Sequence, residues 1–163
     1  GYDYIYVYSH SGYNFKVLDL QAAIGLEQLK KLPAFIRKRR ENFRLLKEGL
    51  DQFSGRLILP KATPDSDPSW FAFPISVKED ADIQRKDIIT FLESRKIQTR
   101  MLFAGNIIRH PAYKNCNYRV SGTLEHTDYI MNNTFFIGVY PGITEEIIGY
   151  IIQAFKDFFK KYA

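Results

Sequence analysis

Cysteine is nearly absent from this sequence of 163 residues. The single thiol, Cys116, excludes a disulfide within the chain and a metal site built only from its cysteines. Histidine is scarce as well: His10, His110 and His126 lie far apart, and each is expected to form hydrogen bonds in a loop rather than to bind a metal. This composition fits a reducing, cytoplasmic compartment.

Long apolar runs are missing too. No stretch approaches the ~18 to 20 residues of a membrane-spanning helix, and residues 1–20 lack a basic-then-apolar leader. We therefore expect no membrane or secretory segment. Hydrophobic residues nevertheless make up 45% of the chain, with 13 Phe and 11 Tyr, which excludes a disordered chain and supplies enough apolar surface for a core.

Signals for nucleic-acid binding are weak. The net charge is only +5, and the densest basic run, RKRR at 37–40, belongs to a pattern that also carries Glu41 and Glu48. We interpret this run as a solvated helix face. No zinc-finger spacing and no aromatic signature of an RNA-binding sheet accompanies it, so no nucleic-acid partner is expected.

Recognisable catalytic motifs are absent. The sequence has no Gly-x-Ser-x-Gly, no phosphate loop ending in Gly-Lys-Ser/Thr, no Gly-x-Gly-x-x-Gly and no His-Glu-x-x-His. Cys116 lies between two asparagines and is interpreted as an unreactive exposed thiol. The sequence therefore predicts no catalytic residue and no metal ligand in this chain.

What is present is an α+β succession of elements. Apolar residues that recur at three and four predict a helix over 17–32, and Pro33, which suits a first turn better than a helix interior, predicts a second helix that starts there and ends near Phe53. Strands are expected at 70–77, 97–102 and 135–139, helices at 85–96, 122–133 and 144–161, and loops at 62–69 and 103–121. The expected architecture is two long helices plus a small sheet with helices packed on it.

Apolar stripes predict the inner faces of these helices. The stripe of the first helix is Leu18, Ala22, Leu26, Leu29 and Leu32, and that of the second is Ile36, Phe43, Leu46, Leu50 and Phe53. The last helix, capped by Thr144, should bury Ile147, Ile148, Ile151, Ile152, Phe155 and Phe159.

Two loop segments offer groups that bind anions. In residues 9–16 (SHSGYNFK), Gly12 permits a close backbone approach, Asn14 offers an amide donor and Lys16 a cation, which together suit a phosphate. The alternative is an ordinary helix entry with Asn14 near the N-cap, and composition alone favours that alternative.

The second segment, residues 99–113, places Arg100 and Arg109 around a strand end and the loop that follows. Guanidinium groups suit pyrophosphate because their paired N–H donors match two oxygens at once. The alternative is that both are ordinary surface arginines.

These segments resemble a known family. Residues 9–16, continuing through 19–29, resemble the start of the C-terminal domain in the DegT/DnrJ/EryC1/StrS sugar aminotransferase family. The motifs that look most like its RfbH-type lipopolysaccharide-biosynthesis dehydrases, which are CDP-4-keto-6-deoxyglucose 3-dehydrases, are PSWFAFP at 68–74, TRMLFAGN at 99–106, PAY at 111–113 and NNTFFIGVYPG at 132–142. The resemblance covers essentially the whole chain.

The resemblance implies the fold of type I enzymes that depend on pyridoxal phosphate. Their large N-terminal domain holds the coenzyme and the catalytic Lys, or His in the dehydrases, and lies outside this sequence. The chain is then a C-terminal fragment that is inactive alone, with the end of the large domain or a linker at 1–16 and the small domain at 17–163. The dehydrases also bind a 2Fe-2S cluster through four upstream cysteines, none of which matches Cys116.

The resemblance also implies site residues and partners. Family members are homodimers in which Asn14 would contact the phosphate of the neighbouring subunit's coenzyme, with Lys16 nearby, so the interpretation of residues 9–16 shifts from helix cap to phosphate contact. Arg100, Asn106 and Arg109 are expected in the substrate cleft. The parent would remove the C3 hydroxyl of a CDP-sugar, using pyridoxamine phosphate and an iron-sulfur flavin reductase, to make 3,6-dideoxysugars for lipopolysaccharide.

Two alternatives stay open. The chain could instead derive from a nucleotide-sugar aminotransferase, which would use a Lys and no cluster. It could also be a free-standing binding or dimerisation module without catalysis.

Overall fold

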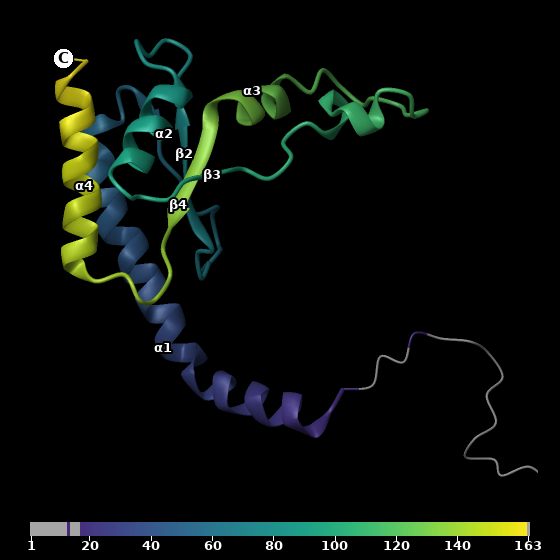
Figure 1. The fold of residues 1–163 in the computed structure, drawn as a ribbon, viewed down its shortest axis with the longest axis vertical. Coiled ribbons are helices and arrows are strands. Elements are labelled where there is room, and N and C mark those ends of the chain that lie inside the picture. The colour runs from purple at the N-terminus through teal and green to yellow at the C-terminus, as the bar shows by residue number, and fades with distance from the viewer. Residues whose placement is uncertain (1–12, 14–16, 163) are drawn as a thin grey trace, which may run out of the picture. The chain divides into compact units, whose positions relative to one another are not determined.

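Figure 1 shows the computed structural model, which describes Tyr13 and residues 17–162. The chain divides into two compact units, Gly1–Pro33 and Ala34–Ala163, and each is described by itself. The helices are α1 (Asp19–Leu50), α2 (Arg85–Ser94), α3 (Glu125–Asn133) and α4 (Glu145–Lys160), with single 3-10 turns at Asp51–Phe53, Ile107–Arg109 and Pro111–Tyr113. The strands are β1 (Leu57–Ile58), β2 (Ala72–Val77), β3 (Arg100–Met101) and β4 (Thr134–Gly138). Within the described residues, none of the helices combines the length and the hydropathy needed to cross a membrane.

The predicted helix break at Pro33 is wrong. One helix, α1, runs from Asp19 to Leu50 with Pro33 inside it. A proline removes one N–H donor and crowds the carbonyl four residues earlier, at a cost of about 3 kcal/mol. The runs on either side, LEQLKKL and AFIRKRRE, are rich in strong helix formers, which favour an uninterrupted helix despite that cost. In the first unit, the apolar stripe from Leu18 to Leu32 is exposed.

The second unit is built on an antiparallel sheet with the strand order β1-β2-β4-β3. The strands predicted at 70–77 and 135–139 are confirmed as β2 and β4, with Phe73 opposite Ile137 and Ile75 opposite Phe135. β3 is a shorter version of the strand predicted at 97–102. The sequence does not predict β1, because two residues carry no periodic signal.

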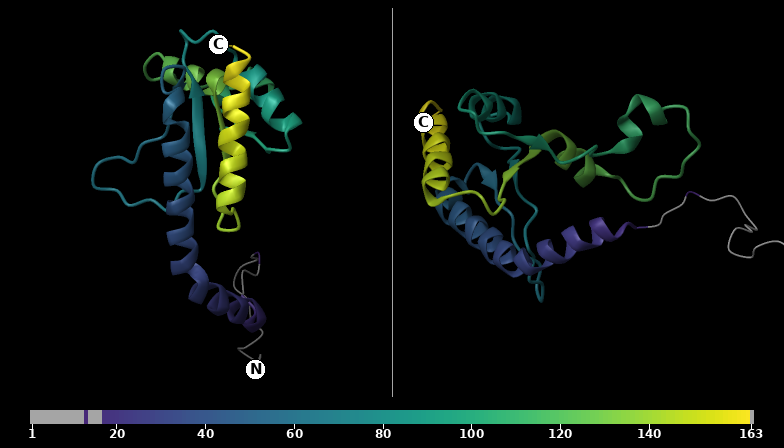
Figure 2. Two further views of the ribbon diagram at one scale, coloured as in Figure 1. Left: turned by 90° about the vertical axis from the view of Figure 1, so that its left-hand side faces the viewer. Right: turned by 60° about the horizontal axis from the view of Figure 1, so that its bottom comes forward.

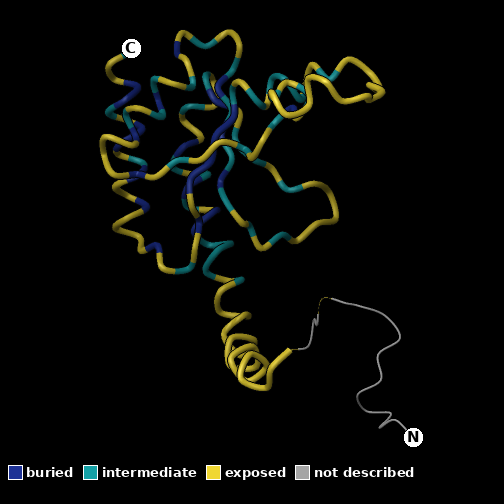
Figure 3. Tube along the Cα trace, turned by 45° about the vertical axis from the view of Figure 1, so that its right-hand side comes forward, coloured by how far each residue is buried: buried dark blue, intermediate teal, exposed yellow. Residues whose placement is uncertain are grey.

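One face of this sheet carries the hydrophobic core. The part of α1 after Ala34, together with α2 and α4, packs on it (Figures 1 and 2), and Figure 3 shows the buried residues gathered there. The predicted inner residues that are buried are Phe43, Leu46 and Leu50 of α1 and Ile148, Ile151, Phe155 and Phe159 of α4. Ile36 and Phe53 are only half-buried.

The inner face predicted for α4 needs two corrections. Ile147 is exposed and Ile152 is half-buried, whereas Ala154 and Phe158 are buried. The buried residues of α4 recur at three and four from Ile148 onward, so the stripe is rotated slightly from the predicted one. The predicted cap is confirmed, because the Thr144 hydroxyl accepts a hydrogen bond from the backbone N–H of Ile147.

The basic run at 37–40 is only partly a solvated face. Arg37 is exposed, but Arg39 donates to the carbonyl of Trp70 at 3.0 Å. Arg40 donates to the carbonyl of Asp67 at 2.9 Å and forms an ion pair with its carboxylate at 2.8 Å. The prediction of a wholly solvated face is therefore wrong, because two of the four cations hold the loop that leads into β2.

Candidate functional site

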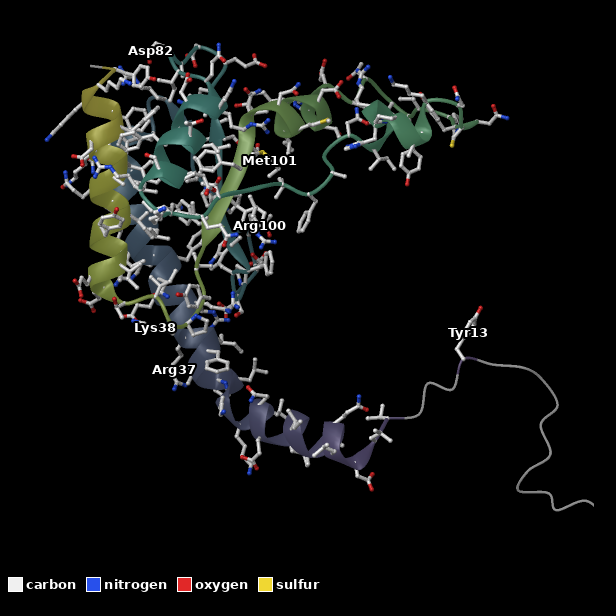
Figure 4. The ribbon with its side chains drawn as sticks, viewed as in Figure 1. Tyr13, Arg37, Lys38, Asp82, Arg100 and Met101 are labelled. Carbon is white, nitrogen blue, oxygen red and sulfur yellow. The ribbon has the colours of Figure 1, made fainter. Side chains whose placement is uncertain are left out.

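The candidate site lies at the edge strand β3 and the loop that follows it, residues 102–113. Arg100 is opposite Phe136 of β4, and Figure 4 shows it beside that strand. Because side chains alternate along a strand, Arg100 and Phe136 lie on the face of the sheet opposite to the core. Arg100 is exposed, and its guanidinium has no hydrogen-bond or ion-pair partner among the described residues. An unpaired guanidinium at an open sheet edge can bind an anion.

A tight turn after β3 directs Phe103 toward the same face. The backbone N–H of Phe103 donates to the carbonyl of Met101 at 2.7 Å, and Phe103 has a φ of 51°. This left-handed conformation costs a residue other than glycine roughly 1–2 kcal/mol. It brings the Phe103 ring to 6.2 Å from the ring of Phe136.

A second phenylalanine, Phe71, immediately precedes β2 and lies near Phe136. The centroid of the Phe71 ring lies 6.0 Å from that of Phe136, in an edge-to-face arrangement. Phe71 is 71% exposed and Phe103 is 76% exposed, whereas Phe136 is only 8% exposed. We call Phe71, Phe103, Phe136 and Arg100 the aromatic face.

The loop after β3 is held by a carboxylate of α3. Asn106, which is 3% exposed, donates from Nδ2 to Oδ1 of Asp128 at 2.7 Å. Arg109 donates to both oxygens of the same carboxylate, from Nη2 at 2.7 Å and from Nε at 3.2 Å. The hydrogen bond from Arg109, followed by that from Asn106, lowers the pKa of Asp128. We call these three residues the Asp128 network.

Two further contacts fix the start of this loop. Gly105 has a φ of 62°, and a Cβ added there would lie 2.6 Å from Cγ of Met131 on α3, so only glycine fits without strain. A ring nitrogen of His110 lies 2.6 Å from the carbonyl oxygen of Ala104. His110 is thus a loop residue that forms a hydrogen bond, as predicted, whereas the same prediction is wrong for His126, which lies within α3.

The structure separates the three predicted substrate-cleft residues into two roles. It brings Asn106 and Arg109 together through Asp128, whereas Arg100 lies outside that network. Sequence reasoning missed Asp128, which lies 19 residues from Arg109, because no local pattern links residues that meet only in the fold. It also missed Phe103, although this residue lies in the TRMLFAGN motif at 99–106.

The predicted coenzyme residues Asn14 and Lys16 lie outside the described residues, and so does His10. In the part of the chain that the structure describes, no group of three or more His, Cys, Asp or Glu side chains is placed to hold a metal ion. Cys116 is exposed. A hollow of about 430 Å³ borders the loop and is lined by Leu102, Phe103, Ala104, Gly105, Ile107, Thr127 and Ile130.

The sequence of the chain matches a known protein family and several of its members. The model of the DegT/DnrJ/EryC1/StrS aminotransferase family matches residues 2–156. The chain is 52% identical over 159 residues to the lipopolysaccharide biosynthesis protein RfbH of Salmonella typhimurium, covering 98% of this chain and 36% of that protein. It is 50% identical to the dTDP-4-dehydro-2,6-dideoxy-D-glucose 3-dehydratase of Saccharopolyspora spinosa, covering 99% of this chain and 35% of that one. The chain thus spans about a third of the length of these relatives.

Solved structures share the fold. E coli GDP-4-keto-6-deoxy-D-mannose-3-dehydratase with bound hydrated PLP matches with a TM-score of 0.81 at 29% identity, covering 92% of this chain and 38% of that chain. An aminotransferase from Psychrobacter cryohalolentis matches with a TM-score of 0.84 at 22% identity, covering 99% of this chain and 43% of the other, which shows the fold alone. The predicted α+β class is confirmed.

Proposed function

Because the chain belongs to the DegT/DnrJ/EryC1/StrS aminotransferase family, we propose that it is the small C-terminal domain of a nucleotide-sugar 3-dehydratase. The observation that carries this proposal is the 52% identity to RfbH over 98% of the chain. Another relative, which is 50% identical, is named as a 3-dehydratase, and this favours dehydration over amination. The proposed substrate is CDP-4-keto-6-deoxyglucose, and the product serves 3,6-dideoxysugar synthesis for lipopolysaccharide.

The proposal assigns the coenzyme, pyridoxamine or pyridoxal phosphate, to a large domain joined to residues 1–16, with residues 17–163 as the small domain. When bound, this coenzyme supplies an electron sink that permits loss of the C3 hydroxyl. From this chain, the Asn14 amide would donate to the coenzyme phosphate of the neighbouring subunit in a homodimer. Lys16 would add a positive charge beside it. Solved relatives with bound PLP support the coenzyme class.

On the substrate side, the proposal gives the three predicted residues distinct tasks. Arg100, with a guanidinium unpaired among the described residues, would contact the diphosphate of the nucleotide-sugar. Asn106 and Arg109 are held by Asp128 and would shape the wall of the cleft rather than bind phosphate themselves.

The described residues do not fit an iron-sulfur cluster, because the chain's single cysteine is exposed and a 2Fe-2S cluster needs four ligands. The proposal therefore places the cluster ligands of the parent outside this chain. An iron-sulfur flavin reductase is the proposed electron donor, and the cytoplasm is the proposed compartment.

The test uses the protein that joins this chain to a large domain. Purified with coenzyme and a reducing system, it should convert CDP-4-keto-6-deoxyglucose to a product that lacks the C3 oxygen, as followed by NMR of the sugar carbons. A product that gains an amino group, given glutamate as donor, would replace the dehydratase proposal with the aminotransferase alternative. No coenzyme-dependent change in the sugar would contradict both and favour a binding module.

A further inference from the structure

Two phenylalanine rings on the aromatic face lie open to solvent. Phe71 and Phe103 are both more than two-thirds exposed, and their ring centroids lie 6.0 Å and 6.2 Å from that of the buried Phe136. Phe103 is held there by a left-handed turn and by a hydrogen bond to Met101. Leaving large apolar rings in water is unfavourable. The Phe103 backbone is strained and its ring is nevertheless exposed, which points to a binding partner for that ring.

The same face carries a cation. Arg100 is the cross-strand neighbour of Phe136, and directly opposed residues have Cβ atoms about 4.5–5.5 Å apart. Its guanidinium is unpaired among the described residues. Arg109, on the loop after β3, is different because it forms an ion pair with Asp128. The aromatic face therefore combines open π surfaces with one uncompensated positive charge.

We propose that the aromatic face binds the nucleoside diphosphate portion of the nucleotide-sugar, with the base stacked on Phe103 and Phe71 and the diphosphate at Arg100. This inference rests on the proposed function and adds the location at which the nucleotide binds. A purely apolar partner would leave the Arg100 charge desolvated without compensation. A simple phosphate would leave both rings exposed. A planar base joined to a diphosphate uses both features at once.

The mode of recognition sets the specificity. Every base has a π face, so stacking on phenylalanine discriminates weakly among bases. The relatives are named for different nucleotides, dTDP in one and GDP in another. We therefore expect CDP, GDP and dTDP to bind this chain with similar affinities, and inorganic pyrophosphate to bind more weakly because it cannot stack.

The test is a titration of the isotopically labelled 163-residue chain with CDP, cytidine and pyrophosphate, followed by NMR. CDP should shift the amides around Phe71, Arg100 and Phe103. Phe103→Leu keeps the apolar bulk but removes the ring, and should weaken CDP binding about 5- to 150-fold, the range for one stacked base. Phe103→Tyr keeps the ring and should bind as the unaltered chain does.

Arg100→Ala should abolish the advantage of CDP over cytidine while leaving cytidine binding in place. The matched controls are Tyr118→Leu and Arg119→Ala, which remove an exposed ring and an exposed cation outside the candidate site and should change nothing. Each variant's unaltered NMR spectrum outside the site shows that it is folded.

The inference is overturned if CDP causes no shifts at about 10 mM, if the shifts map elsewhere, or if Phe103→Leu binds CDP as tightly as Phe103→Tyr. None of these results contradicts the proposed function, because dehydration by the longer protein is measured separately. Conversely, CDP stacking here without any dehydration by the longer protein would contradict the proposed function and leave the site in place.

Discussion

A single carboxylate organises the loop beside the candidate site. Asp128 accepts hydrogen bonds from the buried Asn106 amide and from two nitrogens of Arg109. A bidentate pairing of this kind fixes the orientation of a guanidinium as well as its position. Asp128 thereby makes Arg109 a structural cation, whereas Arg100 has no ion-pair partner among the described residues.

Replacing Asp128 by Asn tests this role with almost no change of shape. The variant keeps an acceptor for Asn106 but loses the charge that pairs with Arg109. We expect faster hydrogen exchange at residues 103–113 and an unchanged rate in α4, measured by NMR. Asp80→Asn, at an exposed aspartate for which the structure gives no ion pair, is the control. Equal exchange rates in both variants would show that the network does not order the loop.

The same network gives the loop a dependence on pH. The hydrogen bond from Arg109 lowers the pKa of Asp128 below its ordinary value of 3.8. A lowered folded-state pKa means that the stabilisation is complete above that ordinary value and is lost as the pH falls through the lowered pKa. An NMR titration should show the Asp128 carboxyl and the amides of residues 103–113 changing together below pH 3.8. A midpoint at or above 3.8 would contradict the assignment.

At the scale of elements, the loop after β3 is shaped by its backbone as much as by its charges. Gly105 and Gly122 both have positive φ, 62° and 79°, but only Gly105 is crowded, with Met131 at 2.6 Å from an added Cβ, whereas Gly122 faces open space. Alanine substitutions at the two positions therefore separate the cost of backbone strain from the cost of steric overlap.

We expect Gly122→Ala to lower the free energy of unfolding by about 1–2 kcal/mol, the cost of a left-handed alanine. Gly105→Ala should add a further 1–3 kcal/mol, because the methyl group must displace Met131 and α3. Urea denaturation of both variants measures the difference. Equal losses would mean that α3 does not pack against the loop as the structure shows.

The elements that follow from the sequence are those with a complete periodic signal. α4 shows apolar residues at three and four over its whole length, and β2 alternates, so both are predictable from local pattern. β1 is too short for such a signal, and the helix break at Pro33 fails because helix formers on both sides outweigh one proline. The pairing of Arg109 with Asp128 depends on α3 folding back over the loop, which no local pattern contains.

At the scale of the whole molecule, the chain matches about a third of the length of RfbH and of a relative named as a sugar 3-dehydratase. Its described residues supply an arginine without an ion-pair partner among them, two exposed phenylalanine rings and a hydrogen-bonded loop. The groups proposed for the coenzyme, Asn14 and Lys16, come before α1, at the junction with the proposed large domain.

In the longer protein, Asn14→Ala should weaken retention of the coenzyme across the subunit interface. Loss of one hydrogen bond to a charged group costs about 1.5–3 kcal/mol, which corresponds to roughly 10- to 150-fold in affinity. Coenzyme content after dialysis measures it, with Asn115→Ala as the control. Full occupancy in the Asn14 variant would exclude the proposed phosphate contact.

The most direct test of the account compares coenzyme binding by this chain alone and by the protein that joins it to a large domain. We propose that this chain contributes only a few polar groups to the coenzyme pocket and that the large domain supplies the rest. Titration with pyridoxal phosphate should then give the coenzyme absorbance band in the longer protein and none in the chain alone. Micromolar binding by the chain alone, with that band, would show that it holds a complete coenzyme site and would contradict the account.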